Sequence, residues 1–201
     1  MVGKTMTVAE VVAEIAKDTV FYDESRGGVT FSGGEPLMQP AFLMALLKAC
    51  GELRLHRTVD TSGYADTKDL LKAAGLAELF LYDLKHMDPE KHRRFTGVSN
   101  AKILANLKCL SRQKTEIVIR FPMVPGFNDD TENIDRTGAF VAALPGVRRL
   151  NILPYHCAAV TKYKNLGVKF RTAGIGQPSR EYLESAAGRL ENYHLEVKIG
   201  G

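Results

Sequence analysis

Gly28-Val29-Thr30-Phe31-Ser32-Gly33-Gly34-Glu35-Pro36 is the stretch of sequence that best indicates how this chain folds. A short β-prone run leads into Ser-Gly-Gly, and an apolar pattern of helical period begins after the proline, so the stretch predicts a strand, a sharp turn and a helix. The two glycines allow a ligand to approach the backbone closely because they carry no Cβ atom. Glu35 follows the strand end, where parallel sheets present functional side chains. An ordinary strand-to-helix turn would also fit this composition, and both interpretations stay open.

Strand and helix patterns alternate through the rest of the sequence. This alternation predicts a parallel sheet with crossover helices, in which five strands precede the last long helix and a closing strand follows it. The segment between Asp18 and Arg26 is polar and is expected to be a connection. Helices are expected to begin at Thr7, Pro40, Asp66, Asp88, Asn100, Thr131 and Ser179, and strands are expected over 28–32, 56–60, 79–85, 116–121, 149–156 and 195–199.

Bulk properties indicate one globular domain over residues 1–201. Hydrophobic residues make up 45% of the 201-residue chain and charged residues 25%, and the net charge is only +4. The charge gives no indication of nucleic-acid binding, and no apolar run is long enough for a membrane span or a secretory signal, so a cytoplasmic protein is expected. The cysteines Cys50, Cys109 and Cys157 are too widely spaced for a metal-ligand motif or a disulfide framework.

Polar or charged side chains stand at the carboxyl end of each of the first five predicted strands. Any one of them has a structural explanation, because Asp60 could brace a turn and Asp83 could form an ion pair with Lys85. Their recurrence at five successive strand ends is harder to explain by packing, and in a (β/α) barrel this end of the strands carries the chemistry. The residues concerned are Glu35, Asp60, Asp83 with Lys85, Arg120 and His156.

Six ordered motifs give the whole chain a resemblance to one family, the radical S-adenosylmethionine (SAM) activating enzymes of glycyl radical enzymes. Gly-Gly-Glu-Pro alone would be weak evidence, but six matches in order are specific. The stretches that carry the resemblance are Ser32-Gly33-Gly34-Glu35-Pro36-Leu37, Asp60-Thr61-Ser62-Gly63-Tyr64, Tyr82-Asp83-Leu84-Lys85, Phe95-Thr96-Gly97, Ile119-Arg120 with Val124-Pro125-Gly126, and Leu153-Pro154-Tyr155-His156.

The resemblance implies both a reaction and roles for these residues. In the family a reduced [4Fe–4S] cluster cleaves SAM, and the resulting radical removes a hydrogen atom from a glycine of pyruvate formate-lyase or a relative, with an electron donor such as flavodoxin or ferredoxin. The roles implied here are SAM binding by Gly33, Gly34, Glu35, Asp60, Lys85 and His156, partner binding by Arg120, and a monovalent cation site at Thr61 and Asp83. No residue is assigned a catalytic role.

The sequence departs from the family in the part that holds the cluster. Three thiolates of a Cys-x-x-x-Cys-x-x-Cys loop are the ligands in the family, and the sequence contains no such loop. By the resemblance, Met1 falls just before the helix that follows this loop. We therefore expect a chain that is inactive alone, whether it is a truncated gene product, an alternative start or a cloned fragment.

The expected fold is an α/β, partial TIM-like (β/α) barrel of the radical SAM type that lacks its first strand. The strand at 28–32 would then have an unpaired edge, and we expect the chain to self-associate or to cover that edge with its N-terminal segment. An alternative function is a non-catalytic fragment that binds SAM or the partner. A third interpretation, acid–base chemistry through Asp83, Lys85 and His156, has the least support.

Overall fold

The computed structural model describes residues 4–155 and 176–200, so His156 and Cys157 lie outside the described residues. The chain forms two compact units. The first comprises Met1–Tyr82 and Lys102–Ile117, and the second comprises Asp83–Ala101 and Val118–Gly201. The single domain expected from the sequence stays a prediction.

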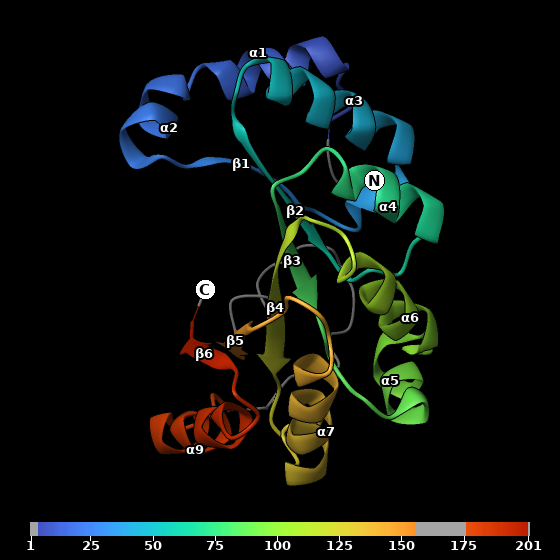
Figure 1. Ribbon diagram of the computed structural model, residues 1–201, viewed down its shortest axis with the longest axis vertical. Helices are drawn as coiled ribbons and strands as arrows, with labels where there is room; N and C mark the ends of the chain where they lie inside the picture. Colours follow the sequence, from blue (N-terminus) through green and yellow to red (C-terminus); the bar gives the residue numbers. More distant parts are fainter. Residues whose placement is uncertain (1–3, 156–175, 201) are drawn as a thin grey trace. The chain divides into compact units, whose positions relative to one another are not determined.

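Within each unit the strands follow one another in chain order, β1-β2-β3 in the first and β4-β5-β6 in the second (Figure 1). The first unit holds β1 to most of β3 and the second unit holds most of β4 to β6. The elements in chain order are α1 (Val8–Ala16), α2 (Thr19–Ser25), β1 (Gly28–Phe31), the 3₁₀ helix η1 (Pro36–Met38), α3 (Pro40–Glu52), β2 (His56–Thr61), α4 (Thr67–Ala74), β3 (Leu79–Asp83), α5 (Pro89–Thr96), α6 (Ala101–Leu110), β4 (Glu116–Met123), α7 (Thr131–Ala142), β5 (Arg149–Pro154), α9 (Arg180–Glu191) and β6 (Glu196–Ile199).

In the first unit, β1 and β2 pair in parallel with Phe31 opposite Val59, and β2 pairs in parallel with β3. Parallel pairing places the carboxyl ends of neighbouring strands at the same edge of the sheet. Buried residues of the strands and of α3, α4 and α6 form the core; they include Leu47, Val59, Leu70, Phe80, Tyr82, Leu107 and Leu110. Figure 1 shows α1 lying alongside α3.

Asn106 of α6 holds the turn that follows β2. The Asn106 side chain is 1% exposed, and its Nδ2 donates to the carbonyl oxygens of Gly63 at 2.8 Å and Ala65 at 2.9 Å. Gly63 has a φ of +71°, and a Cβ atom there would lie 1.7 Å from the Tyr82 hydroxyl, so only glycine fits. These contacts hold the turn that follows Thr61 and Ser62 in one conformation.

In the second unit, β5 pairs in parallel with β4 and with β6, and α7 packs beside α9 (Figure 1). The buried side chains of these elements include Ile119, Phe121, Met123, Ile134, Val141, Leu150, Ile152, Leu183 and Leu190. No helix within residues 4–155 and 176–200 is long and apolar enough to cross a membrane.

The expected elements are confirmed, with one exception. Thr7 and Glu10 form the predicted capping box, and Asp66, Asp88 and Ser179 cap the helices that follow them. The polar connection expected between Asp18 and Arg26 is wrong, because it contains the helix α2. Its seven residues place Val20, Phe21 and Tyr22 consecutively rather than at helical spacing, so its sequence carries no periodic apolar stripe that would reveal it.

The first strand lies at one end of the strand order, as expected. Among the described strands β1 pairs with β2, and α1 packs against α3. Val20 and Phe21 of α2 are 65% and 66% exposed. Self-association through this edge, and its cover by the N-terminal segment, stay predictions.

We predict that Asn106→Ala lowers the free energy of unfolding by about 2 kcal/mol, because it leaves two buried carbonyl groups without a donor. Urea unfolding followed by circular dichroism measures this change. The exposed Asn192→Ala serves as the matched control and should change stability by less than about 0.5 kcal/mol. Equal effects of the two substitutions would contradict the role given to Asn106.

Because two histidines of the second unit are buried, we predict that the free energy of unfolding falls on mild acidification. Burial lowers the pKa of His86 and of His92 below the ordinary value of 6.5. The unfolded chain therefore binds more protons than the folded chain as the pH falls below about 6.5, and the free energy of unfolding decreases there. Urea unfolding at pH 7.5 and pH 5.5 tests this expectation. A His86→Asn/His92→Asn variant should lose most of the decrease, and an unchanged pH dependence in that variant would refute the assignment.

Candidate functional site

The Glu35 carboxylate is the centre of the polar cluster at the carboxyl ends of β1 and β2. It accepts hydrogen bonds from the Thr61 hydroxyl at 2.6 Å, the Ser62 hydroxyl at 2.6 Å and the Ser62 backbone N–H at 2.9 Å. The Leu37 backbone N–H adds a fourth donor at 3.3 Å. An ionised carboxylate has about four acceptor positions, so this one is close to saturated by its own chain.

Local sequence explains why Glu35 occupies this position. Pro36 begins the 3₁₀ helix η1, and Glu35 is its N-cap residue in extended conformation. Thr61 is the last residue of β2 and is 2% exposed. Since β1 and β2 are parallel neighbours, the loop after β1 meets the end of β2 directly.

The Ser32-Gly33-Gly34 turn next to Glu35 is open to solvent. Gly33 has a φ of +128°, which favours glycine, and a Cβ atom at Gly33 or Gly34 would have no neighbour within 4 Å. The Ser32 hydroxyl donates to Asp60 Oδ2 at 2.9 Å, which places a second carboxylate beside the turn. The turn therefore offers exposed backbone and carboxylate oxygens to a cationic group.

A second charged cluster lies in the second unit, at the end of β3 and on β4. Asp83 accepts from Lys85 Nζ at 3.0 Å and from Arg120 Nε at 2.9 Å, with Arg120 Nη2 also at 2.9 Å. The side chains are partly exposed, at 15% for Asp83, 32% for Lys85 and 22% for Arg120. One carboxylate thus orients two cations, which together are suited to binding an anion.

The structure assembles the predicted residues in two groups. In the first unit Thr61 donates to Glu35, and Asp60 accepts from Ser32 beside Gly33; in the second unit Asp83, Lys85 and Arg120 form their own cluster. The Thr61 hydroxyl donates to Glu35. The cation site expected from Thr61 and Asp83 stays a prediction. His156 lies outside the described residues.

Sequence reasoning missed the parts played by Ser62 and Ser32. Ser62 supplies two of the four donors to Glu35, and Ser32 supplies the donor to Asp60. Both residues stand in motifs that were recognised, directly beside residues with predicted roles. Their small hydroxyl side chains, just after strand ends and within three positions of an acidic residue, were the available signal.

The described cysteines do not suit an iron–sulfur cluster. Cys50 is buried in α3, where burial raises the pKa of its thiol, and Cys109 is half-buried in α6. Within residues 4–155 and 176–200, no group of three or more His, Cys, Asp or Glu side chains could hold a metal ion. The three thiolates that a [4Fe–4S] cluster requires are therefore not offered by this part of the chain.

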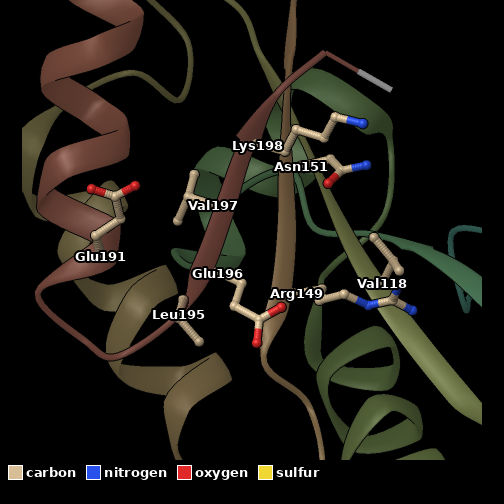
Figure 2. Close-up of a pocket in the computed structure, with 8 residues that line it drawn as sticks. All are labelled: Val118, Arg149, Asn151, Glu191, Leu195, Glu196, Val197 and Lys198. Atoms are coloured by element: carbon tan, nitrogen blue, oxygen red, sulfur yellow. The ribbon is translucent and has the colours of Figure 1, made fainter.

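A cavity of about 610 Å³ in the second unit was not expected from the sequence. Figure 2 shows Arg149 and Asn151 of β5 beside Glu196 and Lys198 of β6, while Val197 points toward the side of α9. The strand register pairs Arg149 with Glu196 and Asn151 with Lys198. The motif residues do not line this cavity, whose complete lining is Val118, Arg149, Asn151, Glu191, Leu195, Glu196, Val197 and Lys198.

Comparison with known proteins shows what the chain is similar to. Residues 2–137 match the model of the radical SAM superfamily. The chain is 38% identical over 203 residues to the trans-4-hydroxy-L-proline dehydratase activating enzyme of Clostridioides difficile, covering 100% of this chain and 67% of that protein. It is 33% identical over 197 residues to the pyruvate formate-lyase 1-activating enzyme of Escherichia coli K12, covering 97% and 80%.

A solved structure agrees with these relatives. The crystal structure of a domain of pyruvate-formate lyase-activating enzyme from Bacteroides vulgatus matches with a TM-score of 0.73 and 36% identity, over 87% of this chain and 99% of that chain. The first four curated relatives are longer, and the chain spans between 56% and 67% of their length. The expected α/β fold of the radical SAM type is confirmed. The chain belongs to the radical SAM superfamily and, within it, to the activating enzymes of glycyl radical enzymes.

Proposed function

We propose that this chain supplies the SAM-binding residues of an activating enzyme for a glycyl radical enzyme. The observation that carries the proposal is the open Ser32-Gly33-Gly34 turn, flanked by the carboxylates of Glu35 and Asp60 at the ends of two parallel strands. Exposed backbone together with carboxylate oxygens suits the amino group of SAM. Bound SAM would supply the sulfonium chemistry, and the chain's own residues would bind and orient it.

The geometry suggests different tasks for the two carboxylates. Glu35 already accepts four donors, so a direct bond to an ammonium group would require one of them to give way. We assign to Glu35 the task of holding Gly33 and Gly34 in place, and to Asp60 direct contact with the amino group. His156, near the adenosyl part of SAM, completes the proposed set on the basis of the family motif.

The second charged cluster fits the anionic end of SAM and the protein partner. Lys85 is a partly exposed ammonium group held by Asp83, and we assign it to the SAM carboxylate. Arg120, held by the same Asp83, is assigned to the glycine loop of the partner. Thr61 and Asp83 are retained as a proposed monovalent cation site. The partner would be pyruvate formate-lyase or another glycyl radical enzyme, and flavodoxin or ferredoxin would be the electron donor.

We propose that these 201 residues do not supply the ligands of the [4Fe–4S] cluster. Their three cysteines are Cys50, Cys109 and Cys157, dozens of residues apart, and two of them lie in helices. On their own the residues would bind SAM weakly and generate no glycyl radical. A second candidate, a non-catalytic fragment that binds SAM or the partner, is favoured by the same lack of cluster ligands.

We predict weak SAM binding by the purified chain, with a dissociation constant above about 100 μM. Isothermal titration calorimetry should show that Asp60→Ala and Lys85→Ala each weaken binding by about tenfold or more, which corresponds to about 1.4 kcal/mol. Asp69→Ala and Lys72→Ala change an exposed ion pair on α4 and serve as charge-matched controls. Equal losses in the controls, or no heat of binding in any protein, would contradict the proposed site.

We predict that anaerobic incubation of the chain with iron and sulfide yields no stoichiometric [4Fe–4S] cluster, because three spaced thiolates are missing. Iron analysis of the desalted protein and its visible absorbance measure the outcome. Cys50→Ala should leave the small amount of bound iron unchanged. Formation of a full cluster in the wild-type chain, and its loss in Cys50→Ala, would contradict the proposal because it would identify Cys50 as a cluster ligand.

A further inference from the structure

We propose that Asn128 is a positioning residue for Lys85. Asn128 lies in the loop between β4 and α7, and Lys85 lies in the loop after β3, both within the second unit. The inference rests on the proposed SAM-binding function of Lys85, and it adds a residue to which neither the motifs nor the comparisons give a role.

Asn128 is completely buried, and both ends of its side-chain amide are used. Its Nδ2 donates to the carbonyl oxygens of Lys85 and Pro122, each at 2.7 Å. Its Oδ1 accepts from the Val124 backbone N–H at 2.8 Å. One side chain therefore joins the backbone of Lys85 to two backbone groups at the end of β4.

A second buried asparagine fixes Asn128 itself. Asn133, in the first turn of α7, is 2% exposed and donates from Nδ2 to the Asn128 carbonyl oxygen at 2.8 Å. Its Oδ1 accepts from the Met87 backbone N–H at 2.8 Å, and its own N–H bonds to the cap residue Asp130. The loop that contains Lys85 is thus held at two backbone positions by two amides, Asn133 on α7 and Asn128 in the loop before it.

This arrangement matters for Lys85 because its side chain is long and flexible. The Asp83 carboxylate holds the Lys85 ammonium group at 3.0 Å, whereas Asn128 holds the Lys85 backbone. With both ends held, less side-chain freedom is lost when an anion binds. Loss of the Asn128 amide would release the backbone end, while the contact between Lys85 and Asp83 could persist in altered orientations.

A purely structural role would have a different energetic signature. If Asn128 only joins two loops, Asn128→Ala weakens SAM binding by the same factor whether or not Lys85 is present. If Asn128 acts through Lys85, its effect on SAM binding disappears once Lys85 has been removed. A double-mutant cycle separates these two cases.

The test measures SAM affinity by calorimetry in the wild type, Asn128→Ala, Lys85→Ala and the double variant. We expect Asn128→Ala to weaken SAM binding about threefold to tenfold, and to cause no further loss in the Lys85→Ala background. Thr137→Val is the matched control, because Thr137 is 1% exposed and its hydroxyl donates to the Asn133 carbonyl oxygen rather than to the Lys85 loop. An equal loss from Asn128→Ala in both backgrounds, or no loss in the wild-type background, would overturn the proposal.

If the wild-type chain shows no SAM binding, that result counts against the proposed function only. Amide hydrogen exchange then tests the positioning role of Asn128 without a ligand. We expect Asn128→Ala, but not Thr137→Val, to accelerate exchange in residues 84–88, where the Leu84 N–H bonds to the Arg120 carbonyl oxygen at 2.9 Å. If Asn128→Ala does not fold, Asn133→Ala takes its place and should accelerate exchange in the same segment. Unchanged exchange in a folded variant would refute the positioning role.

Discussion

The hydrogen bonds to the Glu35 carboxylate are the interactions on which the first unit's candidate site depends. They tie the turn after β1 to the end of β2, and every donor comes from the chain itself. Because donors saturate the carboxylate, the loop is held in one arrangement before any ligand arrives. A rigid loop that contains two glycines can present its backbone groups to a ligand without first changing conformation. In the proposed function, Glu35 therefore braces the turn after β1, and Asp60 makes the direct contact with the ligand.

Each unit contains a buried asparagine that holds irregular backbone near strand ends. In the first unit Asn106 donates to two carbonyl groups of the turn after β2, and in the second unit Asn128 donates to one carbonyl group in the loop after β3 and one near the end of β4. A side-chain amide can satisfy a donor and an acceptor at once, which an irregular backbone needs when it is buried. In both cases a buried asparagine provides the partners that a regular helix or strand would otherwise supply.

Each unit contains a cluster whose charges suit one end of the proposed ligand. Carboxylates flank the open glycine turn in the first unit, and in the second unit one carboxylate holds two cations. In the proposed function, the first cluster serves the ammonium group of SAM and the second serves its carboxylate group. The cavity beside β5 and β6 contains both signs of charge on neighbouring strands, and its residues belong to none of the recognised motifs.

Much of the architecture could be predicted from the sequence because the relevant interactions are local. The capping box of Thr7 and Glu10 involves residues three positions apart, and the alternation of strands and helices is visible as a change of period. The helix α2 could not be predicted in this way, since its few apolar residues are consecutive and form no stripe at helical spacing. The positions of Glu35, Asp60 and Asp83 near strand ends were likewise readable, because each follows or ends a β-prone run. Arg120 instead lies within β4, which continues to Met123.

Apart from α2, the order of the elements, several of their caps and the motif residues can thus be read from the sequence alone. Which groups these residues contact depends on the tertiary structure. Glu35 meets the Thr61 hydroxyl across 26 residues of chain, and Asn128 meets the Lys85 carbonyl group across 43. Contacts of this length depend on which strands pair and in which register, and a sequence pattern does not specify either at the level of single atoms. For this physical reason Asn128, which lies in a loop without periodicity, became visible as a candidate positioning residue only in the folded chain.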